Sequence, residues 1–167
     1  MKRKLLKSIL CSLLIITLVV APISALASSK TAYILKVTGS DKVNVRSGSS
    51  VKGGDSGIIG TVKPGTRVLY WGVKSGQMLK VMGANGQTGY IYQGNLKSYG
   101  AVKRSQVYLT KSATTTYKKS GSTLKKKGTV SANYPVVVYK VIGGYAQAKN
   151  ISGTTVYIKT SALKKAF

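Results

Sequence analysis

Short alternations of apolar and polar residues run through most of the chain. Residues 43–46 (Val-Asn-Val-Arg) alternate and then break into a Ser/Gly run, and residues 88–92 (Thr-Gly-Tyr-Ile-Tyr) alternate again. A period of two predicts half-buried strands, and clusters of Gly, Ser, Asn and Pro between them predict turns. Further strands are expected over 32–38, 67–73 and 78–82 and from Ile58 onward. No long stretch has the period of a helix, so the pattern predicts an all-β protein.

The same plan restarts after residues 98–101 (Ser-Tyr-Gly-Ala), the one plausible linker. A fixed offset of 67 carries Gly76, Met78, Thr88, Tyr90, Ile91 and Leu96 onto Gly143, Tyr145, Thr155, Tyr157, Ile158 and Leu163. A looser offset of 64 places residues 43–46 on residues 107–110, and the second copy then lacks the Asn-x-Arg pattern. This internal repeat predicts two modules, 28–98 and 99–167, each with five or more short strands and a helical turn near its closing leucine.

The first 27 residues differ from the rest. A basic start precedes an apolar run over 9–20 that is too short to span a bilayer, and Ala25-Leu26-Ala27 has the small-x-small form of a cleavage site. The segment is predicted to be a signal peptide, with an uncleaved membrane anchor as the alternative. Because Cys11 lies inside it, the mature chain would contain no cysteine.

Charge narrows the range of partners. The chain has 27 Lys and Arg against two acids, for a net charge of +25, and all thirteen basic residues of 101–167 are without an acidic neighbour in that half. Such an excess favours acidic partners through an attraction that salt screens. Five lysines flank the turn at 120–123, namely Lys118, Lys119, Lys125, Lys126 and Lys127. We predict a polyanion-binding loop there, with a merely solvated charged surface as the alternative.

The sequence has few of the residue types that usually carry out catalysis. There is no His, and Asp41 and Asp55 both lie in glycine-rich turns. These residues provide neither an acid/base pair nor a set of zinc ligands. The many Ser and Lys residues show no motif for a nucleophile pair. We therefore expect no enzyme activity, no metal and no cofactor.

Three stretches together resemble the bacterial SH3-like (SH3b) domain. They are Val43-Asn44-Val45-Arg46-Ser47-Gly48, residues 58–68 with Gly60-Thr61 and Pro64-Gly65, and the closing stretch 88–96. The resemblance implies two tandem small SH3-like β-barrels behind a signal-peptide helix. It also implies export and attachment to the bacterial cell wall, either to peptidoglycan or to teichoic acid. Met78 stands where that family usually has a Trp.

Candidate ligand-binding residues are an Asn/Arg pair and a set of aromatic residues. The Arg46 guanidinium could grip a carboxylate or phosphate beside Asn44, or both residues could only brace the local backbone. Tyr90 and Tyr92 share one face of a strand and Ile91 takes the other, and the sequence leaves open which face is core. The remaining aromatic candidates for a groove are Tyr70, Trp71, Tyr145 and Tyr157.

These features predict a secreted, non-catalytic protein that binds the cell envelope. An extracellular protein-interaction adaptor is the first alternative, with a protein partner in the groove. A nucleic-acid binder is the second, because basic charge and tyrosines also suit that ligand. The oligomeric state is left open.

Overall fold

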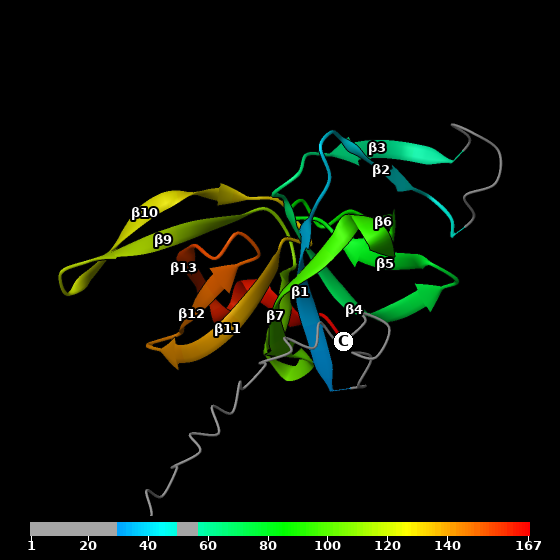
Figure 1. Cartoon of the computed structure of the whole chain (residues 1–167). Helices are drawn as coiled ribbons and strands as arrows, with labels where there is room; N and C mark the ends of the chain where they lie inside the picture. Colours follow the sequence, from blue (N-terminus) through cyan, green and yellow to red (C-terminus); the bar gives the residue numbers. More distant parts are fainter. Residues whose placement is uncertain (1–29, 50–56) are drawn as a thin grey trace, which may run out of the picture.

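Two seven-stranded antiparallel sheets make up the computed structural model, which describes residues 30–49 and 57–167 (Figure 1). The first sheet contains β1 (Thr31–Val37), β2 (Val43–Arg46), β3 (Ile58–Val62), β4 (Arg67–Ser75), β5 (Met78–Met82), β6 (Thr88–Tyr92) and β7 (Leu96–Lys103). The second contains β8 (Val107–Thr110), β9 (Thr114–Ser120), β10 (Thr123–Val130), β11 (Pro135–Ile142), β12 (Tyr145–Asn150), β13 (Thr155–Lys159) and β14 (Leu163–Lys165). The all-β prediction is confirmed. The expected signal peptide and Asp55 lie outside the described residues.

Among residues 30–49 and 57–167, helical structure is confined to three single turns: η2 (Gln93–Asn95), η3 (Arg104–Gln106) and η4 (Thr160–Ala162). The first and last directly precede Leu96 and Leu163, which confirms the expected turn near each closing leucine. Within the ranges that the structure describes, no helix has the length and apolar character needed to cross a membrane.

The two sheets have the same topology. Their strand orders are β3-β2-β6-β5-β4-β1-β7 and β10-β9-β13-β12-β11-β8-β14, so each strand of the second sheet corresponds to the strand seven places earlier. Each order begins and ends with an edge strand. Within the described ranges, the pairing therefore does not close either sheet into the barrel expected from the sequence.

The strand that corresponds to the Val-Asn-Val-Arg stretch is β9, not β8. Arg46 pairs with Tyr90, and Tyr117 of β9 pairs with Tyr157, the repeat counterpart of Tyr90. The 64-residue offset was therefore wrong, because residues 107–110 lie between β11 and β14, the place of β1. Both stretches have apolar residues two positions apart, Val43 and Val45 in one and Val107 and Leu109 in the other, so local sequence alone does not separate them.

Residues 98–101 are not a linker. They lie inside β7 and pair with β1, with Leu35 opposite Ser98 and Tyr33 opposite Ala101. The chain passes to the second sheet at η3, where the Arg104 amide donates to the Lys30 carbonyl with an N–O distance of 3.0 Å. The Gly and Ser of this stretch mark a bulge in the register instead of a boundary.

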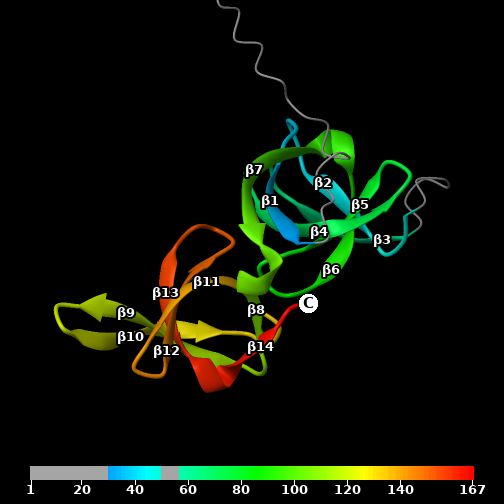
Figure 2. The ribbon, with the colours of Figure 1, turned by 90° about the horizontal axis from the view of Figure 1, so that it is seen from below.

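Each sheet curls around its own core (Figure 2). Alternate residues of β1, β4, β5 and β6 point inward, and the largest fully buried side chains include Tyr70, Leu35, Leu79 and Ile91. In the second sheet, Val136, Ala146, Ala148, Val156, Ile158 and Leu163 form the corresponding core. Smaller residues, including two alanines, fill this second core.

A third apolar cluster joins the sheets. It combines Ala32, Leu69 and Met82 of the first sheet with Val107 of the second and Ile151, which lies between β12 and β13. All five side chains are buried. The outer face of β4 and β1 is therefore covered by the second sheet, and the two sheets pack against each other.

Candidate ligand-binding surfaces

The outer face of the first sheet carries four of the predicted ligand-binding residues. Ile91 is fully buried in the core, so its neighbours Tyr90 and Tyr92 point outward. On the neighbouring strand, Val43 and Val45 pack into the core, which turns Asn44 and Arg46 to the same outer face. The face of β6 that carries Ile91 is therefore the core face, and the face that carries Tyr90 and Tyr92 is the outer one.

Asn44, Arg46 and Tyr92 line one groove of about 390 Å³. Its floor includes Met78, which pairs with Tyr92 across β5 and β6 and is only 3% exposed. The turn between β1 and β2 (residues 39–42) and Asn95 complete the lining. The Asp41 carboxylate accepts a hydrogen bond from the Lys42 amide at 2.6 Å. This groove has the size of a small-ligand site and combines an aromatic ring, an amide and a cation.

Tyr90 lies beside this groove, between two cations. It pairs with Arg46 on one side and with Lys80 on the other, and the Lys80 ammonium is 6.0 Å from the ring centroid. A ring flanked by cations offers an apolar surface bordered by positive charge. The residues are therefore suited to a ligand that is both cyclic and anionic.

Tyr70 and Trp71 do not belong to this surface. Tyr70 points into the first core with 1% of its surface exposed. Its hydroxyl is buried without a hydrogen-bond partner among the described residues. Burial, followed by the proximity of Tyr33, raises the pKa of Tyr70 above its usual range, and Arg104 opposes that rise.

Trp71 points the opposite way from Tyr70 and packs against the cluster between the sheets. Its ring centroid lies 5.9 Å from that of Phe167. The sequence alone did not show that Trp71 is excluded from a groove, because the residues that cover this face of β4 come from the second sheet. Its outer face is covered only once the second sheet packs against it.

The outer face of the second sheet is built around three tyrosines. Tyr117 and Tyr145 meet edge to face with ring centroids 5.5 Å apart, and Tyr157 pairs with Tyr117 across β13 and β9. Gln147 pairs with Tyr157 on the same face. Tyr145 and Tyr157 were predicted from the sequence. Tyr117 was not, because the 64-residue offset matched residues 43–46 to β8 instead of β9. The correct strand alignment places Tyr117 at the position of Arg46.

The five predicted lysines lie on strands, not in a loop. Lys118 and Lys119 belong to β9, and Lys125, Lys126 and Lys127 belong to β10. The two strands form a hairpin that extends from the body of the molecule (Figure 1). At its turn, the Thr123 hydroxyl donates to the Ser120 carbonyl at 3.0 Å. We call residues 114–130 the lysine hairpin.

The lysine side chains divide between the two faces of this hairpin. Lys126 pairs with Tyr117 and therefore shares the face of the three tyrosines. Lys118 pairs with Lys125 on the opposite face. All five lysines are exposed. Lys127 is at a bulge, where its ammonium donates to the Thr155 carbonyl at 3.5 Å.

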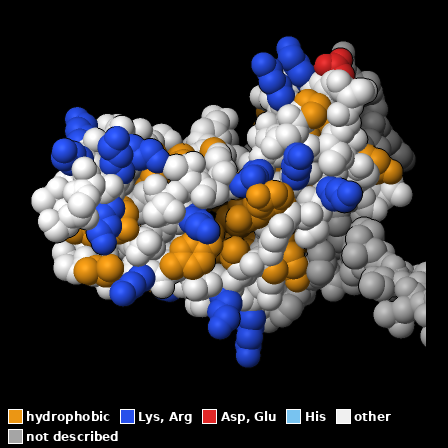
Figure 3. Space-filling view, turned by 60° about the vertical axis from the view of Figure 1, so that its left-hand side comes forward, with side chains coloured by type: hydrophobic (Ala, Val, Ile, Leu, Met, Phe, Trp, Pro, Cys, Tyr) orange, Lys and Arg blue, Asp and Glu red, His pale blue; other side chains and the backbone are white. Residues whose placement is uncertain are grey.

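Basic side chains are scattered over both lobes of the molecule on the face that Figure 3 shows. Acidic side chains appear there at a single edge. In the described ranges Asp41 is the one acidic residue. No cluster of three or more His, Cys, Asp or Glu within those ranges could hold a metal ion.

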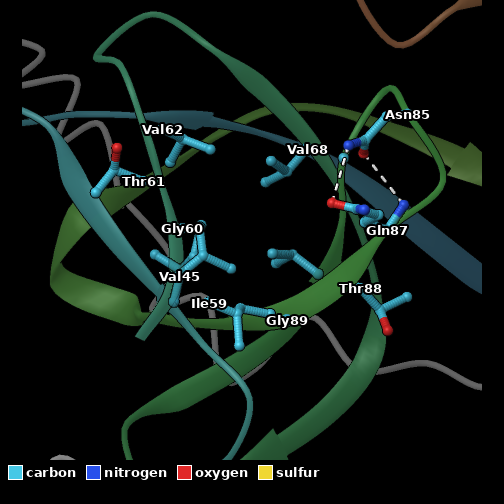
Figure 4. A pocket seen from close by; sticks show the side chains of 13 residues that line it. Val45, Ile59, Gly60, Thr61, Val62, Val68, Asn85, Gln87, Thr88 and Gly89 are labelled. Atoms are coloured by element: carbon cyan, nitrogen blue, oxygen red, sulfur yellow. Dashed lines mark hydrogen bonds between the residues drawn. The ribbon is translucent and has the colours of Figure 1, made fainter. Parts of the chain in front are cut away.

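A small cavity of about 140 Å³ lies inside the first sheet (Figure 4). Val45, Ile59, Val62 and Val68 point toward it, and Asn85 and Gln87 lie at its rim (Figure 4). Two hydrogen bonds of 3.1 Å join Asn85 to Gln87. None of the predicted site residues lines this space. Its volume is below that of ordinary ligand pockets, and Ile59 in its lining is 56% exposed, so it is a small opening at the edge of the core.

Comparisons with known proteins do not place the chain in a family. No family model matches the sequence, and no curated protein matches it. Among solved structures, NlpC2 from Trichomonas vaginalis matches with a TM-score of 0.36 and 16% identity, over 82% of this chain and 49% of that one. NlpC1 from the same organism matches with a TM-score of 0.35 and 18% identity, over 83% and 48%. This chain spans about half the length of those two proteins.

Proposed function

We propose that the protein is secreted and binds anionic polymers of the bacterial cell envelope without catalysing a reaction. In this proposal, its two sheets are tandem SH3-like modules in an open form. The observation that carries the proposal is the pairing of Lys118 with Lys125 in the lysine hairpin. Like charges that face each other across two strands destabilise the pairing. A bound polyanion would relieve that repulsion.

The surroundings of the hairpin support the same ligand class. No acid occurs in residues 101–167, so the thirteen basic residues of that stretch have no carboxylate partner within it. Edge strands often carry lysines simply to prevent aggregation, and β10 is an edge strand. That role alone does not account for lysines on the inner strand β9 as well.

Selectivity would come from the two outer faces. On the second sheet, Tyr117, Tyr145 and Tyr157 offer aromatic surface beside Lys126. On the first sheet, Arg46 and Asn44 line the groove floored by Met78. Tyrosine packs against the apolar side of a sugar ring or peptide while its hydroxyl stays hydrated. Peptidoglycan and teichoic acid both combine such groups with negative charge.

The test is binding of the purified protein to Gram-positive cell walls across a salt series. One sample keeps its anionic polymers and a second is stripped of them by acid. We expect binding to fall on stripping and at high salt. Binding that survives both treatments would indicate peptidoglycan read by the grooves, and failure to bind either wall would contradict the proposal.

A charge-matched pair of variants locates the contact. Replacing Lys118, Lys125 and Lys126 by Gln should weaken wall binding strongly. Replacing the exposed Lys63, Lys74 and Lys164 by Gln changes the net charge equally and should have a smaller effect. Equal losses in both variants would mean that only overall charge matters, and the hairpin would lose its assigned role.

One observation favours nucleic acid as a second ligand. Lys126 beside Tyr117 and Tyr157 resembles a stacking platform for unpaired bases with a cation for the phosphate. A gel shift with single-stranded DNA at about 150 mM salt tests this, because purely electrostatic binding weakens steeply there. Retained binding with loss in a Tyr157→Ala variant would support the alternative.

A further inference from the structure

A second groove lies where the two sheets meet. It has a volume of about 400 Å³ and is lined by β1, β4 and β7 of the first sheet and by β11, β12 and residues 151–153 of the second. Tyr99 and Tyr139 both line it, and each is 53% exposed. Figure 3 shows hydrophobic side chains gathered at the waist between the lobes, with basic side chains beside them. We call this space the junction groove.

Arg67 is held in the junction groove by both sheets. Its Nη1 donates to the Ser152 carbonyl at 2.9 Å, and its Nη2 donates to the Tyr99 hydroxyl at 2.7 Å. The guanidinium carbon also lies 3.7 Å from the centroid of the Tyr99 ring. These contacts use only part of the guanidinium's fork of N–H donors. Arg67 is therefore pre-positioned, with donors left for a ligand.

The position of Arg67 depends on Gly153. A Cβ added to Gly153 would lie 2.8 Å from Arg67 Nη1, and the backbone φ of Gly153 is +86°, where glycine is strongly favoured. The turn of the second sheet thus leaves space for an arginine of the first. The groove consequently exists only because the two sheets are packed together.

A second cation and ring come from the opposite side. The Lys149 ammonium of β12 lies 5.6 Å from the centroid of the Tyr139 ring of β11. The groove lining contains Arg67 and Lys149 and no acidic residue. Two cations, two exposed rings and no compensating charge indicate an anionic ligand with apolar ring surface.

We propose that the junction groove binds a segment of a phosphate-bearing saccharide chain. The phosphate would sit between Arg67 and Lys149, and the sugars would contact the exposed parts of Tyr99 and Tyr139. Phosphate suits this place because its oxygens can accept from a guanidinium on one side and an ammonium on the other. The proposal shares its ligand class with the proposed function, but it concerns a separate site.

The size and walls of the groove fit such a segment. Its volume lies within the range of ordinary ligand sites. Gly100, Ala101 and Gly153 have small side chains or none, so the walls beside them leave space for a ligand. A folded protein partner would need a much larger flat contact than this concave strip provides.

Two variants test the groove without removing the cations. Tyr139→Ala deletes an exposed ring. Gly100→Val adds bulk at a position where an added Cβ meets nothing within 4 Å, so the variant is expected to fold and obstruct the groove. Val73→Ala shortens an apolar side chain that is 40% exposed and lies outside both grooves, and it serves as the control. Circular dichroism of each variant verifies that it is folded.

The readout is titration of the purified protein with a defined phosphorylated oligosaccharide, followed by NMR of tyrosine side chains. We expect Tyr139→Ala and Gly100→Val each to weaken binding about tenfold and Val73→Ala to have little effect. Resonances of Tyr99 and Tyr139 should shift on binding. A neutral oligosaccharide and a uronic-acid oligosaccharide of equal length form the comparison arms.

Each result decides one part of the proposal. Unchanged affinity in both groove variants, or no binding of the phosphorylated chain, would overturn it. Equal binding of the uronic-acid chain would overturn the assignment of phosphate, and equal binding of the neutral chain would overturn the role of the cations. Wall binding that persists in groove variants leaves the proposed function intact, whereas groove binding without wall binding contradicts only the proposed function.

Discussion

Tyr117 and Tyr145 meet edge to face, with ring centroids 5.5 Å apart, at the places that Arg46 and Met78 hold in the first sheet. The same two positions therefore carry a cation and a thioether in one sheet and two aromatic rings in the other. An edge-to-face pair also fixes both rings in place. The outer faces are thus chemically distinct, although the two sheets share one topology.

Removing Tyr145 should weaken binding to a saccharide-containing ligand. Tyr145→Ala deletes the ring and leaves Tyr117 without its partner, at a cost of about 0.5–1.5 kcal/mol in binding. Tyr145→Phe keeps the ring contact and should retain most of the affinity. Wall-binding isotherms at low salt measure both. Equal loss in the two variants would assign the effect to the hydroxyl.

Neutralising one lysine of the hairpin should stabilise the fold while weakening binding. Lys118→Gln removes the repulsion with Lys125, so the free energy of unfolding should rise by about 0.2–1 kcal/mol at low salt. High salt should abolish the gain, because it screens the same repulsion. Denaturant unfolding at two salt concentrations measures this. Lys74→Gln, whose cross-strand partner is Leu79, is the control and should show no such gain.

Gly89 should not tolerate a side chain. A Cβ there would lie 2.4 Å from Val45 Cγ1 and 3.2 Å from the Arg46 carbonyl oxygen. Gly89→Ala is expected to lower the free energy of unfolding by about 1–3 kcal/mol through overpacking. Gly60→Ala, where an added Cβ meets nothing within 4 Å, should be nearly neutral. Similar losses in both variants would point to backbone effects instead.

The buried hydroxyl of Tyr70 is expected to lower the free energy of unfolding. It has no partner among the described residues, so Tyr70→Phe is expected to raise the free energy of unfolding by about 1 kcal/mol. Because the pKa of Tyr70 is raised in the folded protein, the folded state holds its proton at pH values where the unfolded state has lost it. Stability should therefore fall as the pH rises above about 10.

The alkaline loss should be smaller in Tyr70→Phe than in the unchanged protein. Thermal unfolding between about pH 9 and pH 11 compares the two. A Tyr92→Phe variant is the control, because Tyr92 is 40% exposed. An identical pH profile in all three proteins would mean that Tyr70 does not carry the effect.

The single tryptophan reports on the junction between the sheets. Phe167→Ala removes the ring 5.9 Å from Trp71 and with it the contact with Arg104, whose guanidinium carbon lies 5.2 Å from the ring centroid. We expect Trp71 emission to shift to longer wavelength and stability to fall by about 1 kcal/mol. Phe167→Leu should recover part of the stability but not the ring contact. Unchanged emission would mean that Trp71 is shielded by other residues.

Local sequence patterns were sufficient to predict the strands and turns, but not to predict which strands pair with each other. The alternation around Ile91 placed Tyr90 and Tyr92 on one face, and the structure shows that this face is the outer one. The same reasoning gave β8 the place of β9, because Val107 and Leu109 have the spacing of Val43 and Val45, whereas the buried residue of β9 is Thr116. Tyr117 was therefore missed. Only the pairing with Tyr157 identifies its place.

Residues covered by a distant part of the chain were also beyond local reasoning. Trp71 resembles an exposed groove residue until the second sheet packs over it. The junction groove arises in the same way, since Arg67 and Ser152 are 85 positions apart in the sequence. Residues 98–101 resembled a linker because Gly and Ser are typical of boundaries, and their pairing with β1 depends on a strand more than 60 residues earlier.

The shared cluster around Leu69 and Val107 has an evolutionary consequence. Cutting the chain at η3 would expose Leu69 on one fragment and Val107 and Ile151 on the other, so neither half would be expected to fold well alone. Gene rearrangements could therefore transfer the pair to a new protein only as a whole. We therefore expect the two sheets to be inherited together as one unit.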